Sequence, residues 1–328
     1  MTYGMIQKSV ADMGCRVSQA TLKNRVAMGA DCLEPLMEPL RREMIEGDRL
    51  QTDETTVEVE SRVEGEKRPH YHKEWMYNFL NPAKKLTQYR YKDGDRGSYV
   101  IVDYLDGRDK SITLYMNGDG SKMMETFHPG HSNEGENVVH IPCAAHMRRP
   151  FWNLRNVEPE AKEISDCFDE LFIRNRSYML RGLSPGEIRE ERLKDFPDIL
   201  QKISGRLDRL SGNRDRFRHK DLYAAVDYVR RLWPYFLAVL KRGDVSLDNN
   251  LCEQQMRPIA IYRNNSLFCG SHKGAERLAN VMSLIQSCRL QKLNVYDYIS
   301  DVLKRIRNYA GNLVDLLPHK WQPAPVTA

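Results

Sequence analysis

Acidic residues at the ends of strand-like segments are the first feature of this sequence that could do chemistry. Asp53 lies in the segment LQTDETTVEV, and Asp119 follows SITLYMN between two glycines that allow close backbone approach. In open α/β sheets, binding sites form at strand ends. Two aspartates brought together repel each other unless a cation lies between them, and Mg²⁺ prefers such carboxylate oxygens. Taken singly, either aspartate would be an ordinary cap or turn residue.

Asp103 is a rival to Asp119 for the second carboxylate. It ends the apolar run VIVD, which could be a strand, although Ser98 could equally cap a short helix there. The Gly-Asp-Gly setting favours Asp119.

A third acidic residue lies in the segment DNNLCEQQMRP, which begins at Asp248. Asp248 or Asn249 can cap the start of a helix, expected at 248–257. Glu253 and Arg257 are then four residues apart on one face. Alone, this pair would be an ordinary surface ion pair.

The elements that must position these residues follow from hydrophobic periodicity. Residues 1–48 are predicted to be helical, with Ser18 as a cap and Gly47 as a stop. Alternating segments rich in Val, Thr and aromatic residues predict five strands, at 50–61, 74–80, 86–92, 111–117 and 137–142. A short helix is expected at 122–127, and from Ala144 onward the pattern is helical, at 144–156, 159–181, 185–210, 217–241, 248–257, 273–291 and 294–310.

The combination of motifs resembles transposases of the insertion sequence 66 family. LQTDETTVEV resembles the first catalytic strand of that family, with its Asp-Glu-Thr signature, and LYMNGDGS resembles the second. CAAHMRRPFW is similar to a Cys-x-x-His-x-Arg-Arg-x-Phe segment, and residues 247–303 resemble the long C-terminal signature almost end to end. The resemblance covers nearly the whole chain and is weakest at 60–110 and 155–240.

This resemblance implies an α/β fold with an RNase H-like mixed five-stranded sheet, a large helical insertion and helical terminal segments. The long separation of Asp119 and Glu253 accommodates the insertion. The implied organisation is a helical N-terminal segment, the first part of the catalytic core, the insertion, the C-terminal core helices and a tail, at 1–48, 49–154, 155–243, 244–310 and 311–328.

The implied activity is that of a DDE transposase. Asp53, Asp119 and Glu253 match the three catalytic positions and would hold two Mg²⁺ ions, with Mn²⁺ as a substitute. Such ions lie about 3.5–4 Å apart, activate the attacking oxygen and stabilise the leaving oxygen. One site would then cleave a DNA strand and transfer it, with different nucleophiles and no covalent protein intermediate.

DNA is the implied partner, as element ends and as target. The formal net charge is +5, and basic clusters are concentrated after residue 145, which suits a phosphate backbone. The family has Arg-Lys-Asn where this chain has Arg263–Asn264–Asn265, so one positive charge is lost. The predicted DNA contacts are His146, Arg148, Arg149, Arg257, Arg263, Asn265, Ser271, His272 and Lys273.

Other partners follow from the same resemblance: a homo-oligomer assembled on DNA and companion proteins encoded by the element. The family also has an N-terminal zinc-binding, DNA-recognition region, which we expect to lie outside this chain. Its seven cysteines are widely spaced without a Cys-x-x-Cys pair, so we expect reduced thiols and no zinc. No apolar run approaches the roughly 18 residues of a membrane span, and no secretory signal is evident, so a cytoplasmic, nucleoid-associated bacterial protein is expected.

Two other functions remain open. One is a catalytically silent DNA-binding or assembly remnant of a decayed element, and the other is an RNase H-like nuclease with a cellular role. Three retained carboxylates argue against the first, and the C-terminal signature argues against the second. A hydrophobic content of 41% and a charged content of 29% exclude a disordered chain.

Overall fold

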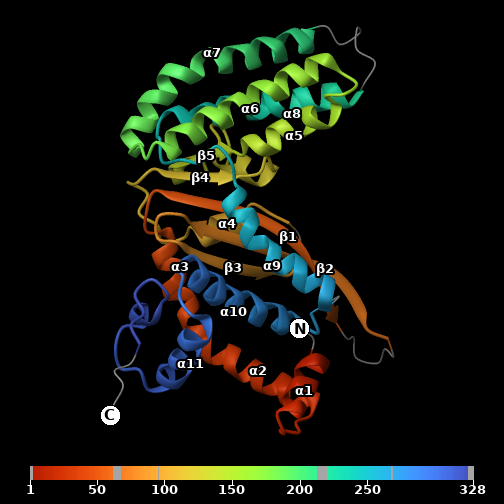
Figure 1. The fold of residues 1–328 in the computed structure, drawn as a ribbon, viewed down its shortest axis with the longest axis vertical. Helices are drawn as coiled ribbons and strands as arrows, with labels where there is room; N and C mark the ends of the chain where they lie inside the picture. The colour runs from red at the N-terminus through yellow and green to blue at the C-terminus, as the bar shows by residue number, and fades with distance from the viewer. Residues whose placement is uncertain (1–2, 62–67, 95, 213–219, 267–268, 324–328) are drawn as a thin grey trace. The chain divides into compact units, whose positions relative to one another are not determined.

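The fold is described by a computed structural model covering residues 3–61, 68–94, 96–212, 220–266 and 269–323. The chain divides into two units (Figure 1), and we describe each by itself. The first unit comprises Met1–Asp109 and Leu251–Ala328, and the second comprises Lys110–Asn250.

The first unit begins with helices, as predicted. Ser18 accepts a hydrogen bond from the backbone N–H of Thr21 at 3.0 Å, which confirms it as a helix cap. The N-terminal helical elements are α1 (Tyr3–Asp12), α2 (Gln19–Leu33), η1 (Glu34–Leu36) and α3 (Met37–Ile45).

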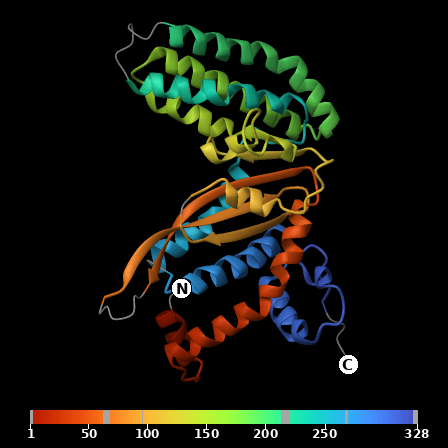
Figure 2. The ribbon, with the colours of Figure 1, turned by 180° about the vertical axis from the view of Figure 1, so that it is seen from behind.

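Three antiparallel strands form the sheet of the first unit: β1 (Arg49–Ser61), β2 (His70–Asn81) and β3 (Leu86–Lys92). Asp53 of β1 is paired with Asn78 of β2, which in turn is paired with Tyr89 of β3. Inward-facing side chains such as Val57 and Met76 form a core with Ala279 of α10 (His272–Leu290). Figures 1 and 2 both show α10 lying along β3, with α2 on the other side of α10.

The ambiguous segment before the second unit is helical. It forms α4 (Tyr99–Tyr104), in which Asp103 is exposed. The alternative in which VIVD is a strand ending at Asp103 is therefore wrong.

The C-terminal part of the first unit contains α9 (Asn250–Ser266), α10, α11 (Val295–Arg305), η6 (Ile306–Asn308) and η7 (Leu313–Leu316). Trp321 then packs edge-on against Tyr298 at 5.5 Å and donates a hydrogen bond to Asp301 at 2.7 Å. The described part of the tail is thus attached to α11.

The second unit has two parallel strands, β4 (Leu114–Gly118) and β5 (Val138–Pro142), which pair Met116 with His140. Between them lie η2 (Lys122–Phe127), as predicted, and η3 (Glu134–Glu136). Four long helices and a short one follow: α5 (Ala144–Leu154), α6 (Pro159–Leu180), α7 (Pro185–Gly212), α8 (Lys220–Phe236) and η5 (Leu237–Leu240).

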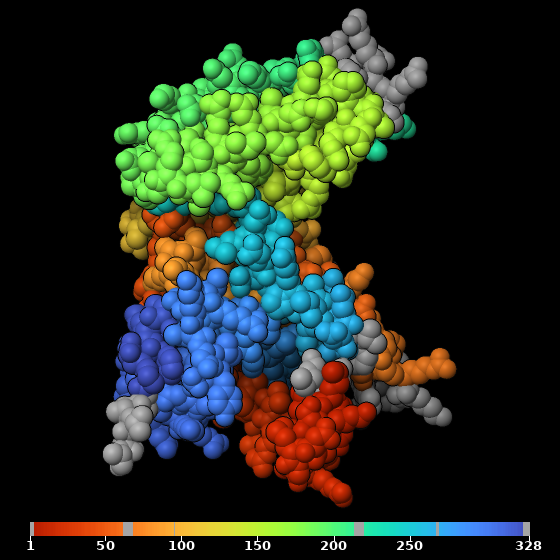
Figure 3. All heavy atoms as spheres, in the orientation of Figure 1, coloured from red at the N-terminus to blue at the C-terminus, as the bar shows by residue number. Residues whose placement is uncertain are grey.

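These helices pack together on one side of β4 and β5, as Figures 1 and 2 show. Their shared core contains Phe151, Phe168, Phe196 and Phe236, each fully buried. In the space-filling view, α6 and α7 lie side by side on the visible face of this unit (Figure 3).

The strand order is β3-β2-β1 with antiparallel pairs in the first unit, and β4 and β5 pair in parallel in the second. This confirms the predicted α/β fold with an RNase H-like mixed five-stranded sheet and helical segments. In the part of the chain that the structure describes, every helix is too short or too polar to cross a membrane.

Candidate active site

Asp53 occupies the middle of β1, where its side chain is half-buried. One carboxylate oxygen, Oδ1, accepts a hydrogen bond from the backbone N–H of Glu54 at 3.0 Å. Glu54 itself is ion-paired with Arg96, which lies over the ring of Trp75 at 5.2 Å. The neighbouring acidic residue is thus neutralised by a cation within the first unit.

The start of α9 is attached to the strands through Cys252. Its backbone N–H donates to Oε1 of Gln51 at 3.2 Å, and its thiol donates to Oδ1 of Asn78 at 3.1 Å. Cys252 and Asn78 are fully buried. Glu253 is the next residue, so these contacts fix the first turn of α9, which carries it.

Cys252 lies in the electrostatic field of two of the predicted carboxylates. Burial raises the pKa of the Cys252 thiol well above its usual range, and the negative charges of Asp53 and Glu253 add to the rise. Asp53 is paired with Asn78 in the sheet, and Asn78 accepts from the thiol of Cys252, which precedes Glu253, so both carboxylates lie near Cys252 in the first unit.

Asp119 lies in the second unit, directly after β4. Its Oδ1 accepts a hydrogen bond from the backbone N–H of Ser121 at 2.9 Å, which is the side-chain turn that aspartate favours. Burial raises the pKa of the neighbouring Tyr228 to about 12, and the charge of Asp119 contributes to this rise. Asp119 thus has a defined position in a tight turn against α8.

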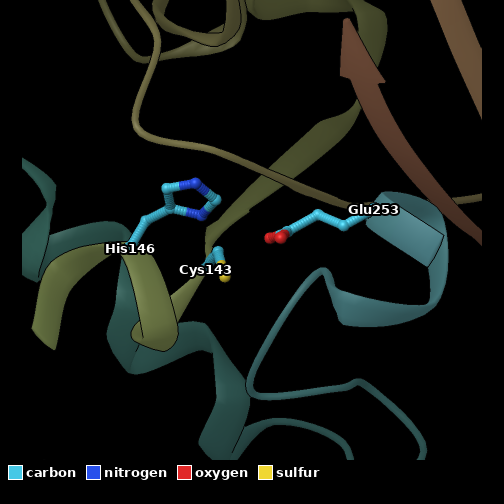
Figure 4. Close-up of side chains that lie close together, drawn as sticks. All are labelled: Cys143, His146 and Glu253. Atoms are coloured by element: carbon cyan, nitrogen blue, oxygen red, sulfur yellow. The ribbon is translucent and has the colours of Figure 1, made fainter. Parts of the chain in front are cut away.

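Cys143 directly precedes α5, and His146 lies in the first turn of that helix (Figure 4). The backbone N–H of Cys143 donates to the carbonyl of Gly118 at 2.9 Å. Its Sγ accepts a hydrogen bond from the backbone N–H of Asn249 at 3.3 Å and lies within 4.8 Å of a ring nitrogen of His146. Figure 4 also labels Glu253 in the first turn of α9.

The residues that precede α9 are anchored within the second unit. The backbone N–H of Ala144 donates to the carbonyl of Leu247 at 2.8 Å, and Nδ2 of Asn117 donates to the carbonyl of Ser246 at 2.9 Å. These contacts hold the residues that lead into α9, which begins at Asn250.

The predicted DNA contacts of the second unit differ in their surroundings. Arg148 is ion-paired with Asp169 at 2.8 Å and stacks on Trp152 at 4.1 Å, whereas Arg149 is exposed. His146 is half-buried. Arg149 is therefore the residue of this group with the most accessible charge.

The predicted DNA contacts of the first unit include several with internal partners. Arg263 donates to the carbonyl of Thr56 at 3.1 Å, and His272 forms a hydrogen bond with Tyr91 at 2.6 Å. Ser271 caps α10 by accepting a hydrogen bond from the N–H of Gly274. Lys273 is paired with Glu276, while Arg257 and Asn265 are exposed.

Sequence reasoning missed the polar residues that hold α9 in place. Gln51, Asn78 and Thr87 are buried polar residues in strands, and Asn78 donates to Thr87 at 2.7 Å. Polar residues at inward-facing strand positions are the signal that could have identified them, because buried polar groups need partners.

Comparison with known proteins gives a family and several relatives. A family model described as transposase IS66 family matches residues 1–277. The uncharacterized protein y4hP of Sinorhizobium fredii (strain NBRC 101917 / NGR234) is 26% identical over 341 residues, covering 95% of this chain and 57% of y4hP.

Two further relatives come from the same strain. The uncharacterized protein y4qI is 24% identical, covering 89% of this chain and 54% of y4qI, and the uncharacterized protein y4jD is 31% identical, covering 55% and 35%. The chain thus spans about half the length, or less, of the curated relatives it matches. Because the family model matches most of its residues, the chain belongs to the transposase IS66 family.

Proposed function

We propose that this chain carries the catalytic site of a DDE transposase, with Asp53, Asp119 and Glu253 as ligands of two Mg²⁺ ions. Membership of the family supports a transposase role, and with it DNA binding and the use of a divalent metal. The observation that carries the residue assignment is geometric: Asp53 is paired in the sheet with Asn78, and Asn78 accepts a hydrogen bond from the thiol of Cys252, the residue before Glu253. For Asp119, the proposal requires that the second unit bring its turn to the other two carboxylates.

The chemistry of the donors fits a hard cation. Carboxylate oxygens are the ligands that Mg²⁺ prefers, whereas thiolates select softer metals. Cys252 lies beside two of these carboxylates, but its raised pKa keeps it a neutral thiol at physiological pH. The half-buried carboxylates of Asp53 and Glu253 would repel each other, and a divalent cation would offset that repulsion.

The proposed reaction is phosphoryl transfer on DNA. Bound divalent metal would make an attacking oxygen more acidic and stabilise the leaving oxygen. Water attacks a DNA phosphorus, the bond to the 3′ oxygen breaks, and a 3′-hydroxyl is released. That hydroxyl then attacks a phosphorus of the target DNA, a new phosphodiester bond forms, and the bond to the target strand's own 3′ oxygen breaks, which leaves that strand with a free 3′-hydroxyl. The roles of the chain's own residues are to hold three carboxylates in place and to contact phosphates, for which exposed Arg149 and Arg257 are suitable.

Nicking of supercoiled plasmid DNA tests the proposal. We expect nicking with Mg²⁺ or Mn²⁺, and its loss by at least a hundredfold in Asp53→Asn, Asp119→Asn and Glu253→Gln, because each removes one ligand charge and leaves the packing unchanged. Asp103→Asn is the matched control, since Asp103 is exposed on α4. Full activity in Asp119→Asn, or loss in Asp103→Asn alone, would overturn the assignment of the second carboxylate.

A further inference from the structure

One face of α8 is directed toward the segment that follows Asp119. Tyr228, Arg231, Leu232 and Tyr235 are spaced three, four and seven residues apart, so they share one side of the helix. All of them contact residues 120–128. Because α8 belongs to the helical region after β5, a part of the chain remote in sequence supports the Asp119 turn.

The closest approach is at Gly120, the residue after Asp119. A Cβ atom at Gly120 would lie 2.3 Å from Oη of Tyr228 and 2.4 Å from Cδ1 of Leu232. A side chain at this position would force Tyr228 or Leu232 to shift. Gly120 therefore allows the backbone of the turn to approach these two side chains of α8 closely.

Arg231 makes two polar contacts with the same segment. Its Nη2 donates a hydrogen bond to the carbonyl oxygen of Gly120 at 2.8 Å, and its guanidinium is ion-paired with Glu125 of η2. The guanidinium also lies over the ring of Tyr228, 5.7 Å from its centroid. Arg231 therefore connects Gly120, the residue after Asp119, with Glu125 further along the same segment.

The far end of the segment is held by aromatic contacts. The ring of His128 stacks on Tyr235 with centroids 3.5 Å apart and planes 15° apart. His128 also shares a 3.0 Å hydrogen bond with His140 of β5, and both histidines are buried. The segment between β4 and β5 is thus held at both ends, by α8 and by β5.

We propose that Arg231 is a positioning residue for the carboxylate of Asp119, and that α8 serves as the support that holds this ligand for divalent metal. Arg231 acts through the backbone of Gly120 and through Glu125, and it does not itself bind metal. The inference rests on the proposed function, because it assigns the purpose of the support to metal binding. Removal of outer groups that orient metal ligands commonly weakens metal binding by 10- to 100-fold.

The test compares Arg231→Ala and Arg231→Lys with Arg230→Ala in the full chain. Arg230 is the matched control, because it is the adjacent residue of α8 and is ion-paired with Asp208 of α7 at 3.3 Å. Mn²⁺ binding is measured by electron paramagnetic resonance, and backbone hydrogen exchange is followed over residues 119–127. Plasmid nicking is measured against Mn²⁺ concentration.

For Arg231→Ala, we expect faster exchange over 119–127 and at least a tenfold increase in the Mn²⁺ concentration needed for half-saturation. Arg231→Lys should recover part of this loss, because its ammonium can still donate to Gly120 or pair with Glu125. Arg230→Ala should match the wild type in both measurements. Unchanged Mn²⁺ binding in a folded Arg231→Ala protein, with or without faster exchange, would overturn the proposal.

Failure of the proposed function gives a different result. In that case the wild-type chain would bind Mn²⁺ without nicking DNA, or would not bind it. Faster exchange in Arg231→Ala together with weaker Mn²⁺ binding than in the wild type would then still support the positioning role. Faster exchange without any Mn²⁺ binding by the wild type would overturn it, since Asp119 would not be a metal ligand.

Discussion

The thiol of Cys252 donates a hydrogen bond to Oδ1 of Asn78 across 3.1 Å, and this contact joins α9 to β2. Asn78 lies opposite Asp53 in the sheet, and Cys252 precedes Glu253 in the helix. One buried contact therefore links the strand position beside the first carboxylate to the helix position beside the third.

Replacing Asn78 should destabilise the first unit. In Asn78→Ala, the hydroxyl of Thr87 and the thiol of Cys252 lose a buried partner, which should lower the free energy of unfolding by about 1–3 kcal/mol. Asn24→Ala, at an exposed position of α2, should change it by less than about 0.5 kcal/mol. Urea unfolding measures both, and equal effects would show that the Asn78 contacts add no stability.

A methyl group at Gly120 should disturb the Asp119 turn. The added Cβ would overlap Tyr228 and Leu232, so Gly120→Ala should lower the free energy of unfolding by about 1–3 kcal/mol and reduce DNA nicking. Gly135→Ala is the control, because no atom lies within 4 Å of its added Cβ. A Gly120→Ala protein as stable and active as Gly135→Ala would contradict this close approach.

Arg192 should be essential to the segment that leads into α9. It is buried in α7 and donates to the carbonyls of Val239, Arg242 and Val245, at 2.7–3.0 Å. Burial lowers the pKa of Arg192 to about 10, so it stays charged at neutral pH. Arg192→Leu leaves these buried carbonyls without a hydrogen-bond donor. It should lower the free energy of unfolding, measured with heat or urea, by about 3 kcal/mol or more.

The control for this substitution is Arg189→Leu, at an exposed position of the same helix. Arg189→Leu should change the free energy of unfolding by no more than about 0.5 kcal/mol. If Arg192→Leu is no more destabilising than Arg189→Leu, the buried guanidinium is not needed to hold the segment.

Glu43 should make stability depend on acid pH. Burial alone would raise the pKa of Glu43, but hydrogen bonds from Lys84 and Lys320 lower it to about 2. A carboxyl group whose pKa is lowered by folding contributes stability that is complete above about pH 4.5 and is lost as the pH falls toward 2. Glu43→Gln should therefore be less stable than the wild type at pH 7, and the difference should shrink below pH 4.5 by up to about 1.4 kcal/mol per pH unit.

Urea unfolding at pH 7, 4.5 and 3 checks this dependence. Glu58→Gln, at an exposed position of β1, is the control for a change of charge alone. If the free energies of unfolding of Glu43→Gln and the wild type differ by the same amount at all three pH values, the ion pairs of Glu43 with Lys84 and Lys320 are not the cause of that difference.

Much of the secondary structure could be predicted from the sequence, because apolar periodicity fixes which side of each element is buried. The short helix at Lys122–Phe127 has the predicted bounds, α6 differs from the prediction by one residue at its end, and α10 differs by one residue at each end. The predicted end of α9 before Pro258 is wrong, since the helix continues to Ser266. A proline inside a helix disfavours its continuation, because proline lacks a backbone N–H. Here the packing of Met256 and Ile259 in the core outweighs that local preference.

The acidic residues that we propose for the site could be identified from the sequence, whereas the contacts that support them could not. Asp53, Asp119 and Glu253 lie in motifs that can be recognised from short stretches of the sequence. The contact between Asn78 and Cys252 joins positions 174 residues apart, and that between Arg231 and Gly120 joins positions 111 residues apart. Such pairs depend on how helices pack on strands, which periodicity alone does not specify.

Metal-directed cleavage of the polypeptide tests the central claim most directly. Fe²⁺ bound in place of Mg²⁺, with ascorbate and peroxide, generates radicals that cut the backbone close to the metal. We expect cuts near Asp53, Asp119 and Glu253 in the same protein, suppressed together by excess Mg²⁺ and by Asp119→Asn but not by Asp103→Asn. Cuts near Asp53 and Glu253 that Asp119→Asn leaves unchanged, or cuts confined to other parts of the chain, would contradict a shared site of three carboxylates.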